Sequence, residues 1–576
     1  MKHLAKFLKG YIPECILAPL FKLLEASFEL VVPLIMAKII DVGIGNANTS
    51  YIVRMGLILV ALAAVGFAAA SAAQFFAAKA AIGFSTGLRS ALLNKIQTLS
   101  YSDLDSNGVS KLITRMTSDV DQAQNGVNQV LRLLLRSPFV VFGAMLVAFT
   151  IDVKSALIFP AVIAVLCIVV FAIIFITLPM HTSVQHGLDD VTAKTRENLN
   201  GVRVLRAFTY EAKEEAEFER RNARLAQLQL RVRRISALLN PITLFIVNIA
   251  IICLIRTGAL RVNTGVLTQG EVVALYNLMS QILIELIKMA NLIITMTRSA
   301  ACAKRCASIF DIESSRLSGT MMPAPDAPHG SVEFHDVSFT FADGSAPAIE
   351  GISFSAAPGE TIGIIGGTGS GKSALINLIP GFYPATEGRV VVDGVDVKQF
   401  DSAALNARIG VVPQKAVLFE GSIRSNLLMG NTNANEELLR ESLKTAQALE
   451  IVENKPHGLD ERVEQGGRNF SGGQKQRLTI ARALVKQPEI LILDDSASAL
   501  DYATDANLRM AIRQMKNRPT TFIVSQRAAS VRYADKIIVM DDGHIVGLGR
   551  HDELIKSCSV YSEIYFSQFK DDGGAA

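Results

Sequence analysis

An uncharged apolar run from Ser155 to Met180 constrains the fold of this chain more than any other feature. Its length, roughly 26 residues, exceeds the ~20 residues that a helix needs to cross the hydrocarbon core of a bilayer. Other long apolar segments, some with a few charges, occupy residues 14–42, 55–78, 137–151, 237–255 and 272–297. The pattern predicts six membrane-spanning helices within about the first three hundred residues, and therefore a lipid bilayer as a partner.

Composition supports a membrane protein and excludes other classes. Of the 576 residues, 50% are hydrophobic and 19% are charged, whereas a soluble globular domain carries about 25% charged residues. The net charge of +4 is too small for a chain that binds nucleic acid by neutralising phosphates, so no nucleic-acid partner is expected. The six cysteines are too few and too scattered for a disulfide framework.

The connections between the predicted spans alternate in length and charge. Residues 43–50 and 152–154 are short, whereas the connections after the second and fourth spans are long and rich in Lys and Arg. Because such connections stay in the cytoplasm, we expect the cytoplasmic (inner) membrane as the location, with both termini on its cytoplasmic side. Strong helix formers fill Glu211–Arg234, which favours rods that continue the spans over separate soluble hairpins. Short turns are expected near Leu112–Ser118 and Glu197–Val202.

The sequence pattern changes after the last predicted span. Residues 314–330 are rich in Pro and small polar side chains and are interpreted as a linker between a transmembrane domain (1–313) and a second domain (331–576). In the second domain, β-branched runs alternate with helical patterns, as in an α/β fold with a largely parallel sheet.

The strongest motif follows a predicted strand, Thr361–Ile365. It matches the phosphate-loop pattern G-x-x-x-x-G-K-[ST], in which backbone N–H groups surround phosphates. Lys372 is expected to reach the terminal phosphates of ATP, and the Ser373 hydroxyl to ligate Mg²⁺. Asp494, at the end of an apolar strand, is the expected metal carboxylate. The loop consists of Gly366, Gly367, Thr368, Gly369, Ser370, Gly371, Lys372 and Ser373. The predicted fold is a membrane α-helical domain fused to an α/β P-loop nucleotide-binding domain.

A second glycine-rich helix start is the most specific feature of the chain. Phe470 precedes a segment whose hydroxyl and backbone N–H groups make another anion-binding helix start. Its residues are Ser471, Gly472, Gly473 and Gln474. One nucleotide does not need two such sites from one chain.

These motifs resemble the ATP-binding cassette family, and the whole chain resembles a half-transporter of the multidrug exporter type. The resemblance implies that Phe470–Gln474 is the signature motif and that Phe341 stacks on adenine. It also implies that Gln414 contacts Mg²⁺ and the membrane domain, and that Ser498–Asp501 spans a dimer interface. In this family two cassettes close head to tail, each phosphate loop facing the partner's signature, which accounts for the two glycine-rich sites.

Two residues depart from the family pattern. Asp495 stands where the family usually has the Glu that polarises the attacking water, and Gln526 stands where it usually has a His that contacts the γ-phosphate. Together they favour a site that binds ATP without hydrolysing it efficiently. The chain is therefore expected to resemble the degenerate-site subunit of heterodimeric bacterial exporters, with hydrolysis mainly at the site shared with a partner half-transporter.

Charged stripes on two predicted spans suggest a substrate cavity. Lys22, Glu25 and Glu29 share one face of the first span, and Glu285 and Lys288 share a face of the sixth. Charges within a span normally face protein or water. Glu25, Glu29 and Glu285 are the expected substrate contacts, with a preference for cations because three carboxylates outnumber two lysines. Alternatively, the stripes are only ion pairs at helical spacing.

The resulting functional interpretation is ATP-driven export of amphipathic small molecules, either drugs or lipid-like compounds. A peptide or siderophore-type carrier is an alternative within the same class. A nucleotide-sensing regulatory subunit that moves no substrate is an alternative from another class, favoured by the degenerate pair. Substrate-dependent ATPase activity and vesicle uptake distinguish transport from regulation.

Overall fold

The computed structural model describes residues 2–312, 319–324, 329–341, 344, 346–496 and 498–569. It divides into two compact units. The first comprises Met1–Gln97 and Ser110–Ile312, and the second comprises Thr98–Val109 and Glu313–Ala576. Much of the expected linker, residues 314–318 and 325–328, lies outside the described residues.

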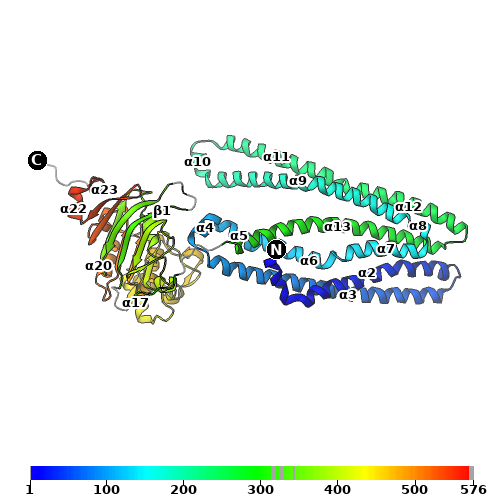
Figure 1. Cartoon of the computed structure of the whole chain (residues 1–576), viewed down its shortest axis with the longest axis horizontal. Helices are drawn as coiled ribbons and strands as arrows, with labels where there is room; N and C mark the ends of the chain where they lie inside the picture. Colours follow the sequence, from blue (N-terminus) through cyan, green and yellow to red (C-terminus); the bar gives the residue numbers. More distant parts are fainter. Residues whose placement is uncertain are drawn as a thin grey trace. The chain divides into compact units, whose positions relative to one another are not determined.

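The first unit consists of helices (Figure 1). Its long helices are α2 (Ile12–Lys38), α3 (Thr49–Gln97), α6 (Val120–Leu133), α7 (Arg136–Ile151), α9 (Ile158–Asn200), α11 (Glu211–Ala237), α12 (Leu239–Asn263) and α13 (Gln269–Phe310). Short helices connect them: α1 (Lys2–Ala5), η1 (Lys6–Tyr11), η2 (Ile39–Ile44), α5 (Val109–Thr114), η3 (Arg115–Asp119), α8 (Val153–Ala156) and α10 (Val202–Ala207). α13 packs against α2, α6, α7 and α12, so it lies at the centre of the unit.

Five helical segments of the described chain are long and apolar enough to cross a membrane. They are Thr49–Gln97, Val109–Ile151, Val153–Asn200, Glu211–Asn263 and Gln269–Phe310. The first of the six predicted spans falls in α2, which is not among these five. α2 contains Lys22, Glu25, Glu29 and Lys38, and these charges lower its apolar character.

Helices α9 and α11 run side by side as an arm of the first unit (Figure 1). Lys194 of α9 pairs with Glu214 of α11 at 2.6 Å, and Arg221 of α11 pairs with Asp190 of α9 at 2.7 Å. The short helix α10 joins the two, directly after the turn expected at residues 197–202. The long connection is therefore a helical rod, as its composition indicates.

A short helix, α4 (Tyr101–Asn107), belongs to the second unit although it lies between spans in the sequence. Ser100 and Asp103 form a capping box at its start. Asp105 accepts a hydrogen bond from the Tyr383 hydroxyl at 2.7 Å. This contact with the α/β domain lies upstream of the turn expected near Leu112–Ser118, a segment that the structure places in α5 and η3. The Ser-x-x-Asp sequence at residues 100–103 was the sequence signal for the start of this helix.

The second unit contains two main sheets. The six-stranded sheet has the order β12 (His544–Gly549), β11 (Lys536–Asp541), β3 (Thr361–Gly366), β10 (Thr520–Val524), β9 (Ile490–Asp494), β6 (Ile409–Val412). All its neighbours pair in parallel except the edge strand β12. The four-stranded antiparallel sheet, absent from the sequence prediction, has the order β2 (Ile349–Ala356), β1 (Val332–Phe339), β4 (Glu387–Val392), β5 (Val395–Asp396).

Helices surround the six-stranded sheet, and β7 (Gly421–Ser422) pairs with β8 (Arg462–Val463) beside it. The helices are α14 (Lys372–Leu378), α15 (Ser402–Arg408), α16 (Ile423–Leu428), α17 (Glu436–Thr445), α18 (Leu449–Glu453), η4 (Gly458–Asp460), η5 (Gln465–Gly467), α19 (Gly472–Val485), α20 (Tyr502–Arg513), α21 (Ala528–Val531), α22 (His551–Ser557) and α23 (Ser559–Gln568). Strands β3 and β10 are buried throughout, as expected for parallel strands covered on both faces.

Strand order positions the candidate site. β10 lies between β3 and β9, and all three run parallel. The phosphate loop follows β3, Asp494 ends β9, and Gln526 follows β10. Because the carboxyl ends of parallel strands lie at one edge of a sheet, these residues meet at the same edge.

Candidate nucleotide site and charged network of the spans

The glycines of the phosphate loop have two different environments. Gly371 has φ of 91°, and a Cβ there would lie 2.5 Å from the Ala348 carbonyl oxygen, so only glycine fits. At Gly367 and Gly369 a Cβ would meet no described atom within 4 Å. The loop is thus fixed by its own chain on one side and open on the other, as phosphate binding requires.

Lys372 is buried within the loop. Its Nζ donates to the Gly366 carbonyl at 2.9 Å and to the Ser370 hydroxyl at 3.2 Å. Burial lowers the pKa of Lys372, while the charges of Asp495 and Asp494 oppose that shift. Two negative side chains therefore help to keep the ammonium charged where phosphates would lie.

A cavity of about 310 Å³ joins most of the predicted residues. Besides Ala348, Ala374 and Val524, it is lined by Phe341, Thr368, Gly369, Ser370, Gly371, Lys372, Ser373, Gln414, Asp494, Asp495 and Gln526. Phe341 lies roughly perpendicular to Phe339 and Tyr383 at ring distances of 4.8 and 5.5 Å, and it is 42% exposed. Residues separated by up to 185 positions thus form one pocket, whose volume lies at the lower end of the range for small-molecule sites.

Ser373 and Asp494 fit a magnesium site. The Ser373 Oγ donates to Asp494 Oδ1 at 3.1 Å, so a hydroxyl and a carboxylate oxygen meet at the loop. Burial raises the pKa of Asp494, and the hydrogen bond from Ser373 opposes that rise. Oxygen donors of this kind are the ligands that Mg²⁺ takes beside nucleotide phosphates.

Asp495 sits in a strained turn directly after β9. Its φ is +44°, which is uncommon for a residue other than glycine. Burial raises the pKa of its carboxyl, whereas a hydrogen bond from the Gln414 side chain and the charges of Arg527 and Lys372 lower it. The Asp495 carboxyl therefore contacts Gln414 and is acted on by the positive charges of Arg527 and Lys372.

Gln526, at the position where the family usually has His and called the switch residue below, is held through its backbone by Gln568 of the last helix, α23. The Gln568 Nε2 donates to the Gln526 carbonyl at 2.7 Å, and the Gln568 Oε1 accepts from the Ala528 N–H at 2.8 Å. Arg527 donates to the carbonyls of Leu500 at 3.0 Å and Ser498 at 3.2 Å, which fixes the segment expected at a dimer interface. Gln568 had no sequence signal, because only folding brings it to the switch.

The signature segment does not line this cavity. Ser471 caps α19: its Oγ accepts from the Gln474 N–H at 3.3 Å, and Gln474 Oε1 accepts from the Ser471 N–H at 3.0 Å. A Cβ at Gly472 would meet nothing within 4 Å in the described chain, and one at Gly473 would lie 3.0 Å from the Ala499 carbonyl. The two glycine-rich sites are therefore separate on this chain.

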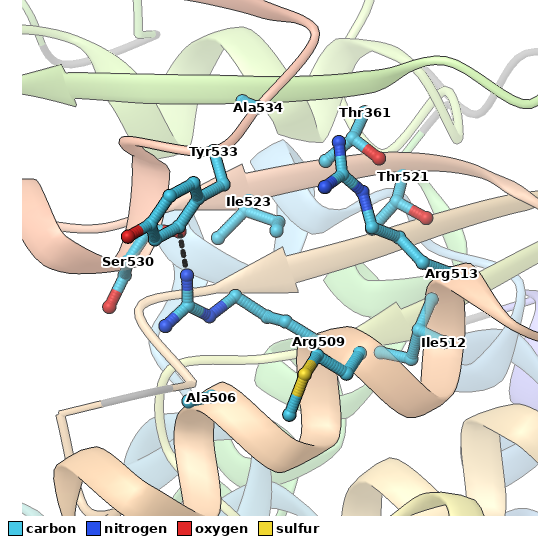
Figure 2. Close-up of a pocket in the computed structure, with 11 residues that line it drawn as sticks. Thr361, Ala506, Arg509, Ile512, Arg513, Thr521, Ile523, Ser530, Tyr533 and Ala534 are labelled. Carbon is cyan, nitrogen blue, oxygen red and sulfur yellow. Dashed lines mark hydrogen bonds between the residues drawn. The ribbon is translucent and has the colours of Figure 1, made fainter. Parts of the chain in front are cut away.

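Another cavity, of about 380 Å³, is lined by residues of α20, β10 and the segment Ser530–Ala534 (Figure 2). Thr361 and Thr521, at the amino ends of β3 and β10, contribute to its wall. Its lining is mostly apolar, and the Arg509 guanidinium is already engaged by the Ser530 carbonyl and the Asp505 carboxylate. Arg513, which also lines the cavity, pairs with Asp535 at 3.3 Å, and the lining contains no glycine loop.

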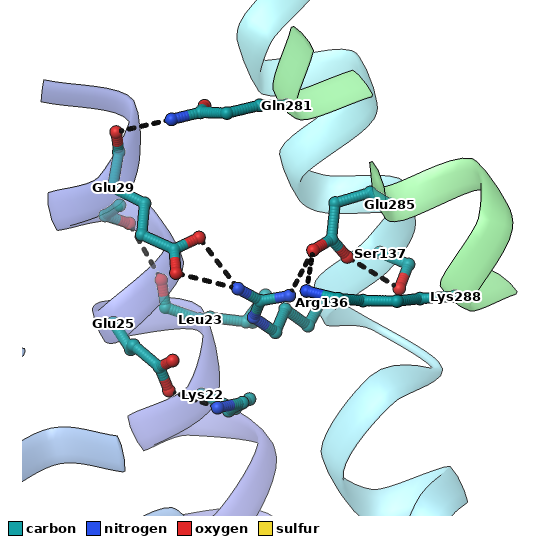
Figure 3. A network of polar contacts seen from close by, with 10 residues as sticks. Lys22, Leu23, Glu25, Glu29, Arg136, Ser137, Gln281, Glu285 and Lys288 are labelled. Atoms are coloured by element: carbon teal, nitrogen blue, oxygen red, sulfur yellow. Dashed lines mark hydrogen bonds and ion pairs between the residues drawn. The ribbon is translucent and has the colours of Figure 1, made fainter. Parts of the chain in front are cut away.

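The predicted substrate contacts of the spans form ion pairs (Figure 3). Glu25 pairs with Lys22 on α2. Glu29 accepts two hydrogen bonds from one nitrogen of Arg136, at 2.9 and 2.7 Å. Glu285 accepts from Arg136 and also from Lys288 at 2.8 Å and Ser137 at 3.0 Å.

Arg136, at the start of α7, was missed by the sequence analysis. Its side chain is buried between Glu29 and Glu285, on two other helices. Adding it to the two lysines balances the three carboxylates, so the charge count behind a preference for cations no longer holds. The available signal was an arginine at the end of an apolar span, opposite one carboxylate that had no lysine.

Comparison with known proteins identifies the family. Residues 15–286 match the profile of the ABC transporter transmembrane region, and residues 349–498 match that of the ABC transporter domain. The uncharacterized ABC transporter ATP-binding protein YfiB of Bacillus subtilis (strain 168) is 35% identical over 100% of this chain and 99% of its own. The putative multidrug export ATP-binding/permease protein YgaD of the same organism is 29% identical over 99% of both.

A solved structure has the same fold. It is a bacterial Atm1-family ABC exporter with ATP bound, which matches with a TM-score of 0.80 over 98% of this chain and 99% of its own, at 22% identity. The chain therefore belongs to the ABC transporter family. It is a multi-pass membrane protein, an ABC exporter and a transport ATPase that binds nucleotide, with the membrane and α/β domains that the sequence predicts.

Proposed function

We propose that this chain is the degenerate-site half of a heterodimeric exporter of amphipathic small molecules, drugs or lipid-like compounds. In this proposal it lies in the cytoplasmic membrane with both termini in the cytoplasm. The observation that carries the assignment is that Asp495 and Gln526 line the same cavity as the phosphate loop. Their place beside the loop supports the roles of base and γ-phosphate contact that the proposal assigns to these two positions.

Asp495 is too short for the role that Glu has in this family. Its side chain has one methylene fewer, which withdraws the carboxylate by about an ångström, and misplacement on that scale can cost roughly a hundredfold in rate. Burial raises the pKa of Asp495 and makes it a stronger base, but basicity does not extend its reach.

Gln526 gives a second reason for slow hydrolysis. Its amide can donate a hydrogen bond to a phosphate oxygen but cannot carry the positive charge of an imidazolium. A preorganised positive charge at that point would stabilise the transition state more strongly than a neutral dipole. ATP held by the loop Gly366–Ser373 is thus expected to bind and remain.

The remaining residues of the pocket are suited to holding nucleotide. Phe341 would stack on adenine, and Lys372 would contact the phosphates. Ser373, Asp494 and Gln414 would hold Mg²⁺, which when bound neutralises charge on the phosphates. The capped signature segment Ser471–Gln474 would complete the partner's hydrolytic site.

The substrate class has separate support. The name of the relative YgaD refers to multidrug export. In this chain, charged side chains on α2, α7 and α13 meet at a pocket among apolar residues, which suits molecules with both polar and apolar parts.

The test is a pair of variants of this chain in the complex with its partner half-transporter, reconstituted in proteoliposomes. Asp495→Asn should leave most of the ATPase activity, because the partner's site performs the hydrolysis. Ser471→Arg should abolish it, because it blocks the signature at that site. Loss of turnover in Asp495→Asn would contradict the assignment, and drug uptake by the wild-type complex tests the export class.

A further inference from the structure

Four charges of alternating sign line a pocket of about 290 Å³ among α2, α7 and α13 (Figure 3). In order they are Glu29, Arg136, Glu285 and Lys288, and each is ion-paired to the next. The two inner side chains are 5% and 3% exposed, whereas the outer two are 42% and 43% exposed. The pocket thus presents one accessible carboxylate and one accessible ammonium, separated by a buried pair.

The network lies near one edge of the membrane. Glu285 is about 24 Å by helical rise from Gln269, at the start of α13, and Arg136 is about 22 Å from Ile151, at the end of α7. At Gln269 and at Ile151, the two helices meet short connections to α12 and α8. Since the hydrocarbon core is about 30 Å thick, the charges lie close to its opposite boundary, where the polar part of an amphipathic molecule resides.

Charge balance restricts the ligand. A cation on Glu29 or an anion on Lys288 would bring an uncompensated charge into a poorly solvated pocket, which is costly. A ligand with both charges satisfies both ends and adds no net charge. In addition, Arg136 Nε and Gln281 Oε1 are buried without a hydrogen-bond partner in the described chain, so polar capacity remains unused beside the pocket.

We propose that this pocket binds the zwitterionic head of an amphipathic substrate, with its ammonium on Glu29 and its phosphate or carboxylate on Lys288. The inference rests on the proposed export function and narrows its substrate class. Arg136 and Glu285 are positioning residues: they fix the polarity of the site by holding the two outer charges apart. The apolar side chains of Val32, Val140 and Ile284 complete the lining.

The test is probe binding to the full chain in phosphatidylglycerol nanodiscs, which contain no zwitterionic lipid. The probes share one tail: dodecylphosphoethanolamine, dodecylammonium and dodecyl phosphate. Glu29→Gln should weaken binding of the first two about tenfold, as expected for loss of one poorly screened ion pair, and should not weaken binding of dodecyl phosphate. Lys288→Gln should weaken binding of dodecylphosphoethanolamine and dodecyl phosphate and should not weaken binding of dodecylammonium.

Matched controls come from the neighbouring ion pair on α2. Lys22→Gln and Glu25→Gln remove the same charges outside the pocket lining and should change no probe's affinity. Glu29→Asp and Lys288→Arg keep the charges and should keep the probe preferences, which separates recognition from misfolding. Equal effects of Glu25→Gln and Glu29→Gln, or loss of all binding in the charge-keeping variants, would overturn the proposal.

Competition with phosphoethanolamine, which has no tail, identifies the source of the head. If phosphoethanolamine displaces the bound probe at concentrations similar to those of dodecylphosphoethanolamine, the ligand is a free small zwitterion. If only dodecylphosphoethanolamine displaces it, the ligand is lipid-like. Uptake of a neutral drug by the reconstituted complex separates the two proposals. Drug uptake by a complex whose chain binds the three dodecyl probes equally would overturn this inference alone. Absence of any ATP-driven uptake would contradict the export function itself.

Discussion

The phosphate loop and the signature segment are both glycine-rich starts of helices, yet their surroundings differ. The loop glycine Gly371 is enclosed by its own domain, since a Cβ there would lie 2.5 Å from a backbone oxygen. The signature glycine Gly472 faces open space. Gly371 is thus fixed by its own domain, whereas a Cβ at Gly472 would meet no atom of the described chain within 4 Å.

The largest predicted effect is the difference in the free energy of unfolding between alanine variants of Gly371 and Gly472. Gly371→Ala should lower the free energy of unfolding by about 1–3 kcal/mol, because its φ of 91° is strained for alanine and the methyl group would contact the Ala348 carbonyl. Gly472→Ala should raise it by up to about 1 kcal/mol, since alanine is the better helix former. Thermal unfolding of the full chain in detergent measures both.

The same pair should differ in activity. In the complex with the partner, Gly472→Ala should impair ATP hydrolysis without loss of stability, because the methyl group projects where a nucleotide held by the partner would lie. Equal destabilisation by the two variants would remove the contrast between an enclosed site and an open one.

The motif-bearing part of the site was predictable because its information is local. Gly366–Ser373 follows a strand recognisable by its β-branched residues, and Asp494 ends another. Parallel pairing then brings the strand ends together, so the sequence indicated a pocket that the structure contains. The fold class is confirmed for the same reason, although the separate antiparallel sheet containing β1 and β4 was not anticipated.

Contacts between distant segments could not be predicted. Gln568 reaches the switch from a helix 42 positions away, and Arg136 reaches Glu285 across 149 positions. Neither belongs to a local pattern. The expected preference for cations came from counting charges on two spans, and the third helix, α7, changed the count. The same limit explains why the contacts of α4 with Phe382 and Tyr383 were not anticipated.

The smallest predicted effect is the pH dependence of the stability that the Asp495 carboxyl contributes. Because burial raises the pKa of Asp495, the folded chain binds its proton more tightly than the unfolded chain, whose aspartates have a pKa of about 3.9. The stability linked to this group is therefore complete below that value and is lost as pH rises through the folded pKa. Asp495→Asn should raise Tm by about 1–2 °C near pH 7.5, with the gain fading toward pH 4.

Asp501 is the matched control for this titration. Hydrogen bonds from the Thr504 backbone and side chain lower the pKa of its carboxyl, so its ionised form stabilises the cap of α20. Asp501→Asn should therefore lower Tm near pH 7.5, the opposite sign. Melting curves of the two variants across this pH range distinguish a carboxylate that opposes folding from one that supports it.

The central claim is that Asp495 and Gln526 make the nucleotide pocket slow. The most direct measurement is single-turnover ATP hydrolysis by the purified full chain, compared with the double variant Asp495→Glu/Gln526→His, with ATP affinity measured in parallel. The Glu restores the longer carboxylate, and the His restores a side chain that can carry positive charge. Together they should raise the hydrolysis rate at least about tenfold while ATP affinity stays within about twofold. A wild-type chain that alone hydrolyses ATP as fast as the double variant would contradict the account.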